Sequence, residues 1–397
     1  MAGGSELPQP AQCRTQQITV EYDYPVVFTR DLFAADNDDL LWCFARREPE
    51  RRHKVYVIVD QGVAEAWPRL TAEIERWFDH RSERVTLLAR PLVIVGGEAA
   101  KNDGDFVSAL LARFRDVKLD RQSFVLIVGG GAVLDAAGYA AAITHRGVRV
   151  VRAPTTVLSQ NDAGIGVKNG VNAFATKNFL GTFAPPFAVI NDIDFIRTLG
   201  ARDRRAGIAE AVKVACIRDA PFFDWLEENR AGLKDSEPAV MQEMIRHCAD
   251  LHLQHISGCG DPFEMGSARP LDFGHWAAHR LEAMSRHALR HGEAVAIGIA
   301  LDTRISVLTG RLQASEQERI WGTLADVGFQ LWHPALAEAG PDGRLAVLRG
   351  LDEFREHLGG ELTVTLLDAI GRGVEVHEID EAAVGEAIVD LKRAMGA

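Results

Sequence analysis

The stretch "FVLIVGGGAVLDAAGYAAAI", residues 124–143, carries the most information about the fold. Its apolar character could suggest a membrane span, but Asp135 lies within it and three glycines follow a β-branched run. A short β-branched run that ends in glycines is typical of a buried strand, a tight turn and a helix. We therefore predict strand, turn and helix here, and no membrane span.

The glycine turn at residues 129–131 has the form of a phosphate-binding turn. Glycines let the backbone approach a pyrophosphate, which then sits at the N-terminus of the following helix. The spacing differs from the usual G-x-G-x-x-G, so a purely structural turn is the alternative. Asp60 at the end of "VIVD", and Thr155 and Thr156 in "APTT", add polar groups at two other strand ends. These features together favour a dinucleotide site.

Outward from this stretch, strand-like and helical runs alternate through the first half of the chain. The strand-like runs are 54–60, 84–97, 123–131 and 148–156, and the helical runs are 64–78, 104–116 and 137–147. This alternation is typical of βαβ units with a parallel sheet. From about residue 200 helical patterns dominate, at 203–218, 238–256, 273–289, 292–308 and 315–327. We predict an α/β domain over 1–198 and a mainly helical domain over 199–397.

The composition is that of an ordinary soluble globular protein, with 47% hydrophobic and 25% charged residues in 397. A net charge of -12 argues against nucleic acid or an anionic membrane as the main partner. The five cysteines are scattered without CxxC spacing, which indicates reduced thiols in a cytoplasm. The first residues lack the pattern of a signal peptide. We expect a cytoplasmic protein that acts on a small molecule.

Candidate metal ligands gather in "GHWAAHRLEAMSRHALRHGE", residues 274–293, which holds four of the thirteen histidines. His275 and His279 are one helical turn apart and share a face. Glu210 lies in the small and apolar stretch "RAGIAEAVKVA", where a buried carboxylate needs a compensating partner such as a cation. Lys213 adds a cation one turn from Glu210. Two imidazoles and one carboxylate form a catalytic divalent-metal site, most simply for Zn²⁺.

The residue types alone do not decide which two histidines bind the metal. His291 opens a helix whose following face is apolar, whereas His287 lies in the charged stretch "MSRHALR". We therefore rank His275 and His291 as ligands. His279 is a nearby proton-handling group in this interpretation, and His287 is solvated.

A second candidate site lies in "NDAGIGVKNGVNAFATKNFLG", residues 161–181, a stretch rich in Gly and Asn. Lys168 and Lys177 in this loop are candidates for a phosphate clamp. The alternative is that both lysines only make the loop soluble. Asp162 and Asn178 beside them favour an ordered polar site.

The motifs GGGAVLD, APTT, NDAGIGVKNGVN, TKNFLG, AGIAEAVK, DFGHWAAH and HGEAVAIG, in this order, resemble those of the dehydroquinate synthase-like sugar phosphate cyclases. The resemblance is collinear from about residue 55 to 300. Within that superfamily, "GDPFEMGSARPLDFGHW" (260–276) is most similar to the 2-epi-5-epi-valiolone synthases, which cyclise sedoheptulose 7-phosphate and release phosphate. The resemblance implies a Rossmann-like NAD-binding domain, a helical metal-binding domain, an active site in the cleft between them, and a homodimer.

The resemblance also assigns roles to individual residues. It implies a Zn²⁺ or Co²⁺ site at Glu210, His275 and His291. The implied NAD contacts are Asp60, Glu98, Lys101, Gly129, Gly130, Gly131, Asp135, Thr155, Thr156 and Thr198, with Lys168 and Lys177 beside them. The substrate-facing positions are Asp162, Lys168, Lys177, Asn178, Lys213, Asp272 and His279.

The implied reaction begins with transient oxidation of a substrate hydroxyl by NAD⁺, which acidifies the neighbouring C–H bond. Phosphate then leaves by β-elimination, with Lys168 and Lys177 offsetting its charge. Reduction of the ketone and an intramolecular aldol step complete the carbocycle. NAD⁺ is regenerated and acts as a catalyst.

Departures from dehydroquinate synthase bear on the substrate, because that enzyme's substrate carries a carboxylate. Its usual pattern has Arg seven residues and Asn three residues before the first metal-binding His. Ala268 and Asp272 stand there in this chain, with Arg269 shifted by one, and a usual upstream Lys corresponds to Gln254 when counted without gaps. Fewer cations and one more anion disfavour a carboxylated substrate. Asp272 can accept hydrogen bonds from the hydroxyls of sedoheptulose 7-phosphate.

Alternatives to a 2-epi-5-epi-valiolone synthase stay open at this point. Another C7-cyclitol synthase, forming a valiolone epimer or a gadusol precursor, would use the same substrate, and 3-dehydroquinate synthase would use the carboxylated one. A metal-dependent polyol dehydrogenase shares the expected fold, but the paired lysines and Glu210 speak against it. A catalytically silent binding protein is disfavoured because all three candidate ligands are present. Near the C-terminus, Arg355 or His357 is the candidate replacement for a family lysine.

Overall fold

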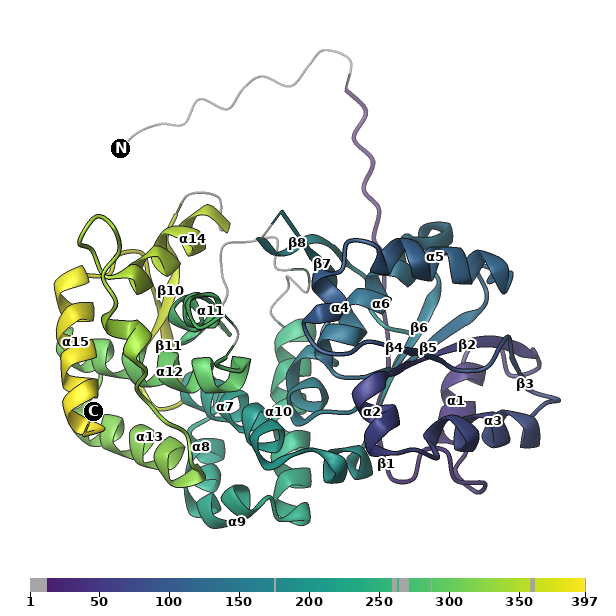
Figure 1. The fold of residues 1–397 in the computed structure, drawn as a ribbon, viewed down its shortest axis with the longest axis horizontal. Coiled ribbons are helices and arrows are strands. Elements are labelled where there is room, and N and C mark those ends of the chain that lie inside the picture. The colour runs from purple at the N-terminus through teal and green to yellow at the C-terminus, as the bar shows by residue number, and fades with distance from the viewer. Residues whose placement is uncertain are drawn as a thin grey trace.

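The computed structural model describes residues 13–174, 176–258, 263, 271–286, 288–357 and 361–396. A sheet-containing half and a helical half lie beside each other (Figure 1). The last strand of the large sheet ends at Asp192, and the first long helix of the second half begins at Ala201. The predicted fold class, α/β followed by a mainly helical part, is confirmed, and a domain boundary at residue 198 stays a prediction.

The large sheet is parallel in all of its pairings. Its strands run in the order β1 (Val26–Thr29), β9 (Ala188–Asp192), β6 (Arg149–Pro154), β5 (Phe124–Gly129), β2 (His53–Asp60) and β3 (Val85–Leu87), and β4 (Leu92–Ile94) also pairs with β2. The carboxyl ends of the strands lie along one edge of a parallel sheet, where ligands bind in open α/β folds. Asp60, the glycine turn and Thr155 all follow strands at this edge.

Helices cover both faces of this sheet. Alternate residues of β2 point to opposite sides, so Val55, Val57 and Val59 pack with α1 (Asp39–Ala45) and α3 (Leu70–His80). Tyr56 and Ile58 pack on the other side with α5 (Phe106–Asp116) and α6 (Gly131–Ile143). Because these strands are buried on both faces, their sequences are apolar at successive positions and do not alternate with polar residues.

The stretch 124–143 forms strand β5, the glycine turn and helix α6, as the sequence predicts. Every residue of β5 is buried between the two layers of helices. Among the described residues, no helix combines the length and the apolar character that a membrane crossing needs.

Two runs that we expected to be single elements are divided. The helical run 64–78 forms α2 (Gln61–Ala66) and α3, because Pro68 cannot continue the first helix. The strand-like run 84–97 forms β3 and β4, which pair with successive parts of β2. Short α4 (Ala99–Asn102) then leads into α5.

The helical half is built around α12 (His291–Leu308), most of whose residues are buried. Helices α7 (Ala201–Arg218) and α11 (His275–Met284) contribute to the same apolar core. The other helices of this half are α8 (Ala220–Glu228), α9 (Arg230–Asp235), α10 (Pro238–Gly258), α13 (Ala314–Val327), α14 (Arg349–His357) and α15 (Glu381–Ala394). An antiparallel pair, β10 (Val364–Ala369) and β11 (Arg372–Val376), completes it.

The stretch 161–181, which we expected to be a loop, contains a β-hairpin. Strands β7 (Lys168–Ala173) and β8 (Thr176–Phe183) pair antiparallel. Gly170 lies opposite Gly181, and a side chain on either would come within 3.0 Å of the opposite strand's backbone. Glycine is rare inside strands, so the feature that permits this close pairing also hid the hairpin in the sequence.

The side chain of Arg152 on β6 is fully buried and binds the backbone that leads into the hairpin. Its guanidinium donates to the carbonyl oxygens of Gly164, Gly166 and Lys168 and to Asn169 Oδ1, at 2.6 to 3.1 Å. These bonds fix residues 164–169, which lead from Asp162 into β7. A buried cation therefore orders the backbone on which two candidate site residues stand.

The carboxylate of Asp192 ties the end of β9 to the loop after β1. It accepts hydrogen bonds from the backbone nitrogens of Leu32 at 2.8 Å and Asp194 at 2.9 Å. Burial outweighs these bonds and raises the pKa of Asp192 to about 6. The folded protein therefore binds a proton here more tightly than the unfolded chain does, and stability is gained as the pH falls below about 6.

We expect the stability advantage of the wild type over Asp192→Asn to depend on pH. The variant cannot take up the proton, so the advantage in unfolding free energy should be about 1 kcal/mol larger at pH 5 than at pH 8. Urea unfolding of both proteins at the two pH values measures this difference. An advantage that is equal at the two pH values would contradict the raised pKa.

Candidate functional site

The candidate metal ligands come together from three helices. Glu210 lies on α7, and His275 and His291 are the first residues of α11 and α12. Glu210 Oε1 lies 3.6 Å from His275 Nε2 and 3.3 Å from His291 Nε2. Glu210 and His275 are buried, and His291 is partly buried. A carboxylate oxygen and two imidazole nitrogens directed at one point form the donor set of a divalent-metal site.

Hydrogen bonds on the far side of each imidazole determine which nitrogen carries the proton. His275 Nδ1 lies 3.1 Å from the carbonyl oxygen of Phe273, and His291 Nδ1 lies 3.2 Å from Glu282 Oε2. Both oxygens only accept, so Nδ1 is the donor in each ring. The Nε2 lone pairs then face the Glu210 carboxylate, which is repulsive unless a cation lies between them. The residues therefore fit a divalent metal ion.

A proton is the other cation that can relieve this repulsion. Burial alone would lower the pKa of His291, but Glu210 and Glu282 raise it to about 9. Burial and the Lys213 ammonium lower the pKa of His275 well below its usual value. Metal and proton compete for His291 Nε2, so a metal bound here would be held less tightly as the pH falls.

Charged side chains surround the metal group. Burial alone would raise the pKa of Glu210, but Lys213 and His291 lower it to about 2. Lys213 Nζ lies 2.5 Å from Glu210 Oε2, and the carboxylates of Glu210, Asp162 and Asp272 raise the pKa of Lys213 against the effect of burial. Three carboxylates thus lie near one ammonium and leave an excess of negative charge. A divalent cation bound beside them would bring the net charge of these side chains closer to zero.

The start of α11 is held against α12 by direct backbone contact. Gly274 has a φ of +78°, and a side chain on Gly298 would come within 1.9 Å of the Gly274 carbonyl oxygen. Buried Asp302 on α12 accepts hydrogen bonds from Gly274 N at 2.9 Å and Trp276 Nε1 at 2.8 Å. These contacts fix the residues on either side of His275 and so fix its imidazole.

A second set of potential ligands shares His291 and consists of His279, Glu282 and His291. His279 is exposed on α11, and its ring centroid lies 6.0 Å from that of His291. Glu282 faces His291 Nδ1 on one side and Lys177 Nζ, at 3.2 Å, on the other. The Glu210 group is more deeply buried and is the better metal candidate. His279 stays a candidate proton-handling group.

The sequence analysis did not single out Glu282. The spacing could have indicated it, because Glu282 follows His275 by seven residues. That is two helical turns, so both side chains lie on the same face of α11. A carboxylate behind a metal-binding imidazole is a common feature of metal sites. The pairing with Lys177, which comes from a distant hairpin, could not be inferred from spacing.

His252 on α10 is a further residue that the sequence analysis missed. Its Nδ1 lies 3.0 Å from Asp162 Oδ1. Counting without gaps had pointed to Gln254, but Gln254 is exposed and lies about 200° further around the helix. His252 is thus the residue of this helix segment that faces the candidate site.

The predicted nucleotide-binding turn lies at the carboxyl edge of the sheet. The carboxylate of Asp60 accepts from Gly62 N at 2.8 Å and from Gly130 N at 3.5 Å. A side chain on Gly129 would come within 3.0 Å of the Asp60 side chain. Thr155 Oγ1, beside this turn, is buried and has no hydrogen-bond partner within the part of the chain that the structure describes. An open turn, a carboxylate and an unpaired hydroxyl fit a nucleotide phosphate and ribose.

Four further predicted site residues, Glu98, Lys101, Asp135 and Asn178, belong to one polar cluster. Lys101 Nζ donates to Asp135 Oδ2 at 2.9 Å and to Asn178 Oδ1. Asn172 donates to Glu98 Oε1 at 2.9 Å and accepts from Asn178 N at 2.8 Å. The hairpin is therefore bonded to Lys101 through Asn178 and to Glu98 through Asn172, and Lys101 in turn bonds Asp135 on α6.

The two hairpin lysines have different positions. Lys177 reaches Glu282 beside the metal group, whereas Lys168 is exposed at the far end of the hairpin, opposite Phe183. Lys177 lies six residues along β8 from Phe183, the partner of Lys168, so the two backbone positions are about 15 to 20 Å apart. Their joint role as a phosphate clamp stays a prediction.

The remaining candidates have local partners or lie outside the described residues. Thr156 Oγ1 lies 2.8 Å from Ser159 Oγ, and Thr198 Oγ1 donates to the Phe195 carbonyl at 2.9 Å. Arg355 lies 3.8 Å from Asp352 on its own helix. Ala268, Arg269, His287 and the side chain of His357 lie outside the described residues.

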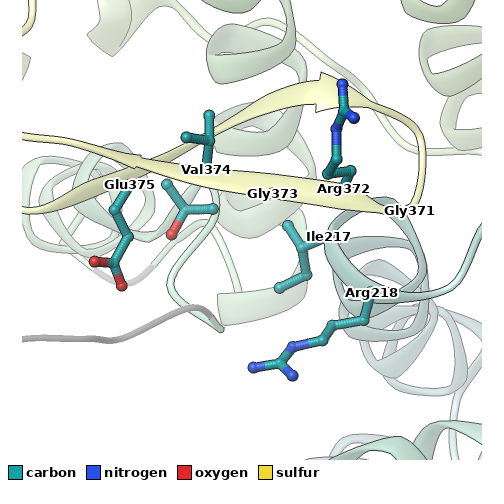
Figure 2. Close-up of a pocket in the computed structure, with 8 residues that line it drawn as sticks. Ile217, Arg218, Gly371, Arg372, Gly373, Val374 and Glu375 are labelled. Carbon is teal, nitrogen blue, oxygen red and sulfur yellow. The ribbon is translucent and has the colours of Figure 1, made fainter.

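The cavity drawn in Figure 2 is separate from these residues. It has a volume of about 310 Å³ and lies between the end of α7 and strand β11. Its lining includes Arg218, eight residues or about 12 Å along α7 from Glu210, and none of the metal group.

Comparisons with known proteins connect this geometry to a family. A family model described as 3-dehydroquinate synthase N-terminal matches residues 91–206, and one described as 3-dehydroquinate synthase C-terminal matches residues 207–344. The chain is 38% identical over 309 residues to a 3-dehydroquinate synthase of Xanthomonas oryzae pv. oryzae, covering 76% of this chain and 81% of that one. It is 32% identical over 371 residues to a 3-dehydroquinate synthase of Rhodopseudomonas palustris, covering 91% and 92%.

Solved structures extend the similarity to the whole fold. ValA, a 2-epi-5-epi-valiolone synthase of Streptomyces hygroscopicus with NAD⁺ and Zn²⁺ bound, matches with a TM-score of 0.84 and 28% identity, over 96% of this chain and 99% of its own. A 2-deoxy-scyllo-inosose synthase with carbaglucose-6-phosphate, NAD⁺ and Co²⁺ has the same fold, with a TM-score of 0.72 and 21% identity over 92% and 96%. The chain belongs to the dehydroquinate synthase-like family of sugar phosphate cyclases.

Proposed function

We propose that the protein converts sedoheptulose 7-phosphate to 2-epi-5-epi-valiolone with release of phosphate. The observation that carries this proposal is Asp272, whose carbonyl oxygen accepts from His275 N at 2.9 Å and whose carboxylate is among those that raise the pKa of Lys213. The similarity to ValA over nearly the whole length of both chains supports it. The proposal includes a homodimer, as the resemblance implies, and a cytoplasmic location, as the cysteine pattern indicates.

The charge around the metal group supports a neutral sugar chain over a carboxylated one. Asp162, Glu210 and Asp272 are acidic, and Lys213 is already held by Glu210 at 2.5 Å. A substrate carboxylate would add a further negative charge at this place. Sugar hydroxyls donate hydrogen bonds to carboxylates, so a polyol suits the same group.

NAD and a divalent metal are the proposed cofactors. Glu210, His275 and His291 would hold the metal, and Asp60, the glycine turn and Thr155 would hold NAD. When bound, NAD⁺ accepts and later returns a hydride, and the metal polarises a substrate oxygen.

The chain's own residues would bind and orient the substrate. Asp162, fixed by His252 at 3.0 Å, and Asp272 would accept hydrogen bonds from hydroxyls. Lys213 keeps Glu210 ionised, and exposed His279 can exchange protons between the site and solvent. Lys168 and Lys177 would offset the charge of the departing phosphate.

3-Dehydroquinate synthase is the second candidate function. The 38% identity with the Xanthomonas enzyme, over 81% of its length, favours it. Asp272, where that family usually has Asn, counts against it. Another C7-cyclitol synthase would be consistent with the same site, because the residues do not fix which face of the ring closes.

Phosphate release tests the substrate assignment. Purified protein with NAD⁺ and Zn²⁺ or Co²⁺ should release phosphate from sedoheptulose 7-phosphate and not from the carboxylated substrate of dehydroquinate synthase. NMR of the product should identify 2-epi-5-epi-valiolone. No net NADH should accumulate, because the hydride is returned.

The opposite preference would make the protein a 3-dehydroquinate synthase. Stoichiometric NADH formation would make it a polyol dehydrogenase. Substrate binding without turnover by metal-loaded protein would support a binding function instead.

Removal of a metal ligand tests the proposed centre. Replacement of Glu210, His275 or His291 with Ala should lower both bound zinc and phosphate release at least about 100-fold, because two remaining ligands do not form a stable site. Metal analysis after dialysis and the phosphate assay measure the two effects. His247→Ala, which removes a half-exposed histidine that pairs with Asp219 at 2.9 Å, is the matched control and should retain zinc. Full zinc in Glu210→Ala would contradict the ligand set.

Asp272→Asn tests the specificity argument. The change keeps the shape but removes the charge, so kcat/KM for sedoheptulose 7-phosphate should fall about 10- to 100-fold while zinc content stays unchanged. Asp250→Asn, on the exposed side of α10, is the control and should behave as the wild type. An unchanged kcat/KM in Asp272→Asn would remove the main support for a neutral substrate.

A further inference from the structure

Glu282 on α11 stands between the metal group and the β7–β8 hairpin. The residue is 5% exposed. Its Oε2 faces His291 Nδ1 at 3.2 Å, and both of its oxygens lie 3.2 Å from Lys177 Nζ. One buried carboxylate is thus shared between a candidate metal ligand in one half of the chain and a lysine from the other half.

On the metal side, Glu282 sets the state of His291. Because the carboxylate accepts from Nδ1, the lone pair of the neutral ring lies on Nε2, which faces Glu210 Oε1 at 3.3 Å. The same bond restricts rotation of the imidazole. A carboxylate in this position orients the ring and makes it a stronger metal ligand.

On the hairpin side, Glu282 holds a strand that is otherwise mainly exposed. Most residues of β8 are exposed, including Phe179 at 55%. Strand β7 makes most of the hairpin's contacts with the sheet-containing half, against α6 and α4, and β8 adds the bond between Asn178 and Lys101. The ion pair between Lys177 and Glu282 therefore connects the outer strand of the hairpin to the helix that carries His275.

We propose that Glu282 is a positioning residue that couples metal binding at His291 to the placement of the β7–β8 hairpin. The proposal rests on the proposed metal centre. A cation on His291 Nε2 would hold the ring with its Nδ1–H directed at Glu282. The carboxylate would then be fixed in the position from which it meets Lys177 Nζ.

The coupling acts in both directions. If bound metal strengthens the pairing with Lys177, then the pairing strengthens metal binding by the same factor. The hairpin carries Lys168, Lys177 and Asn178, three of the predicted cofactor and substrate residues. Metal binding would therefore prepare the hairpin side of the site before the substrate arrives.

Zinc affinity and hydrogen exchange test the coupling. Glu282→Gln should bind Zn²⁺ about 10- to 100-fold more weakly than the wild type in competition with a chelating dye. Lys177→Met, a change on a partly exposed side chain that leaves the folded core intact, should weaken Zn²⁺ about fivefold or more. In the wild type Zn²⁺ should slow amide exchange of residues 176–183, and both variants should lose this effect.

Glu293→Gln is the matched control. Glu293 also stands in the first turn of α12, but its carboxylate pairs with Arg202 at 2.5 Å and accepts from Arg290 N. It should keep Zn²⁺ affinity within about twofold and keep the zinc-dependent protection of the hairpin.

The outcomes separate this inference from the proposed function. A wild type that binds no Zn²⁺ would refute the metal centre and the coupling with it. A wild type that binds Zn²⁺, with Glu282→Gln and Lys177→Met equal to it in affinity and exchange, would refute the coupling alone. Weakening in Glu293→Gln as large as in Glu282→Gln would show general loosening of α12 and would also overturn the coupling.

Discussion

The central constraint on this protein is the burial of a carboxylate opposite two imidazole lone pairs. Glu210 Oε1 lies within 3.6 Å of both Nε2 atoms, and hydrogen bonds behind each ring direct those nitrogens inward. The arrangement is unfavourable without a positive charge at its centre, and the surrounding fold maintains it. The close crossing of α11 and α12 at Gly274 and Gly298, and the bonds of Asp302, hold the donors in place.

The sequence predicted the parts of the fold that depend on local pattern. The β-branched run before the glycines predicted β5 and α6, and the alternation around it predicted a parallel sheet, because strands buried on both faces must be apolar throughout. The division of 64–78 at Pro68 and the β7–β8 hairpin were missed. In the hairpin the pairing depends on glycines that allow close approach, and such residues carry little strand signal.

The site could be predicted only where neighbours in sequence are neighbours in space. Glu210 was found because a carboxylate in an apolar helix needs a partner, and His275 because it lies on a histidine-rich helix. Residues such as Glu282 and His252 act through partners 105 and 90 positions away, Lys177 and Asp162, so their roles require the tertiary structure. The separation of the two lysines could not be predicted from the sequence either. The pairing of the hairpin strands places Lys168 and Lys177 at opposite ends.

The buried guanidinium of Arg152 has a consequence for local opening of the molecule. Its hydrogen bonds to Gly164, Gly166, Lys168 and Asn169 compensate a charge that is fully enclosed by protein. If residues 164–169 detached alone, that charge would lose most of its acceptors while still inside the sheet layer, a costly state. The segment therefore cannot fray as an independent surface loop. It should open only together with the centre of the sheet, which makes the backbone around the site part of the most protected unit of the first half of the chain.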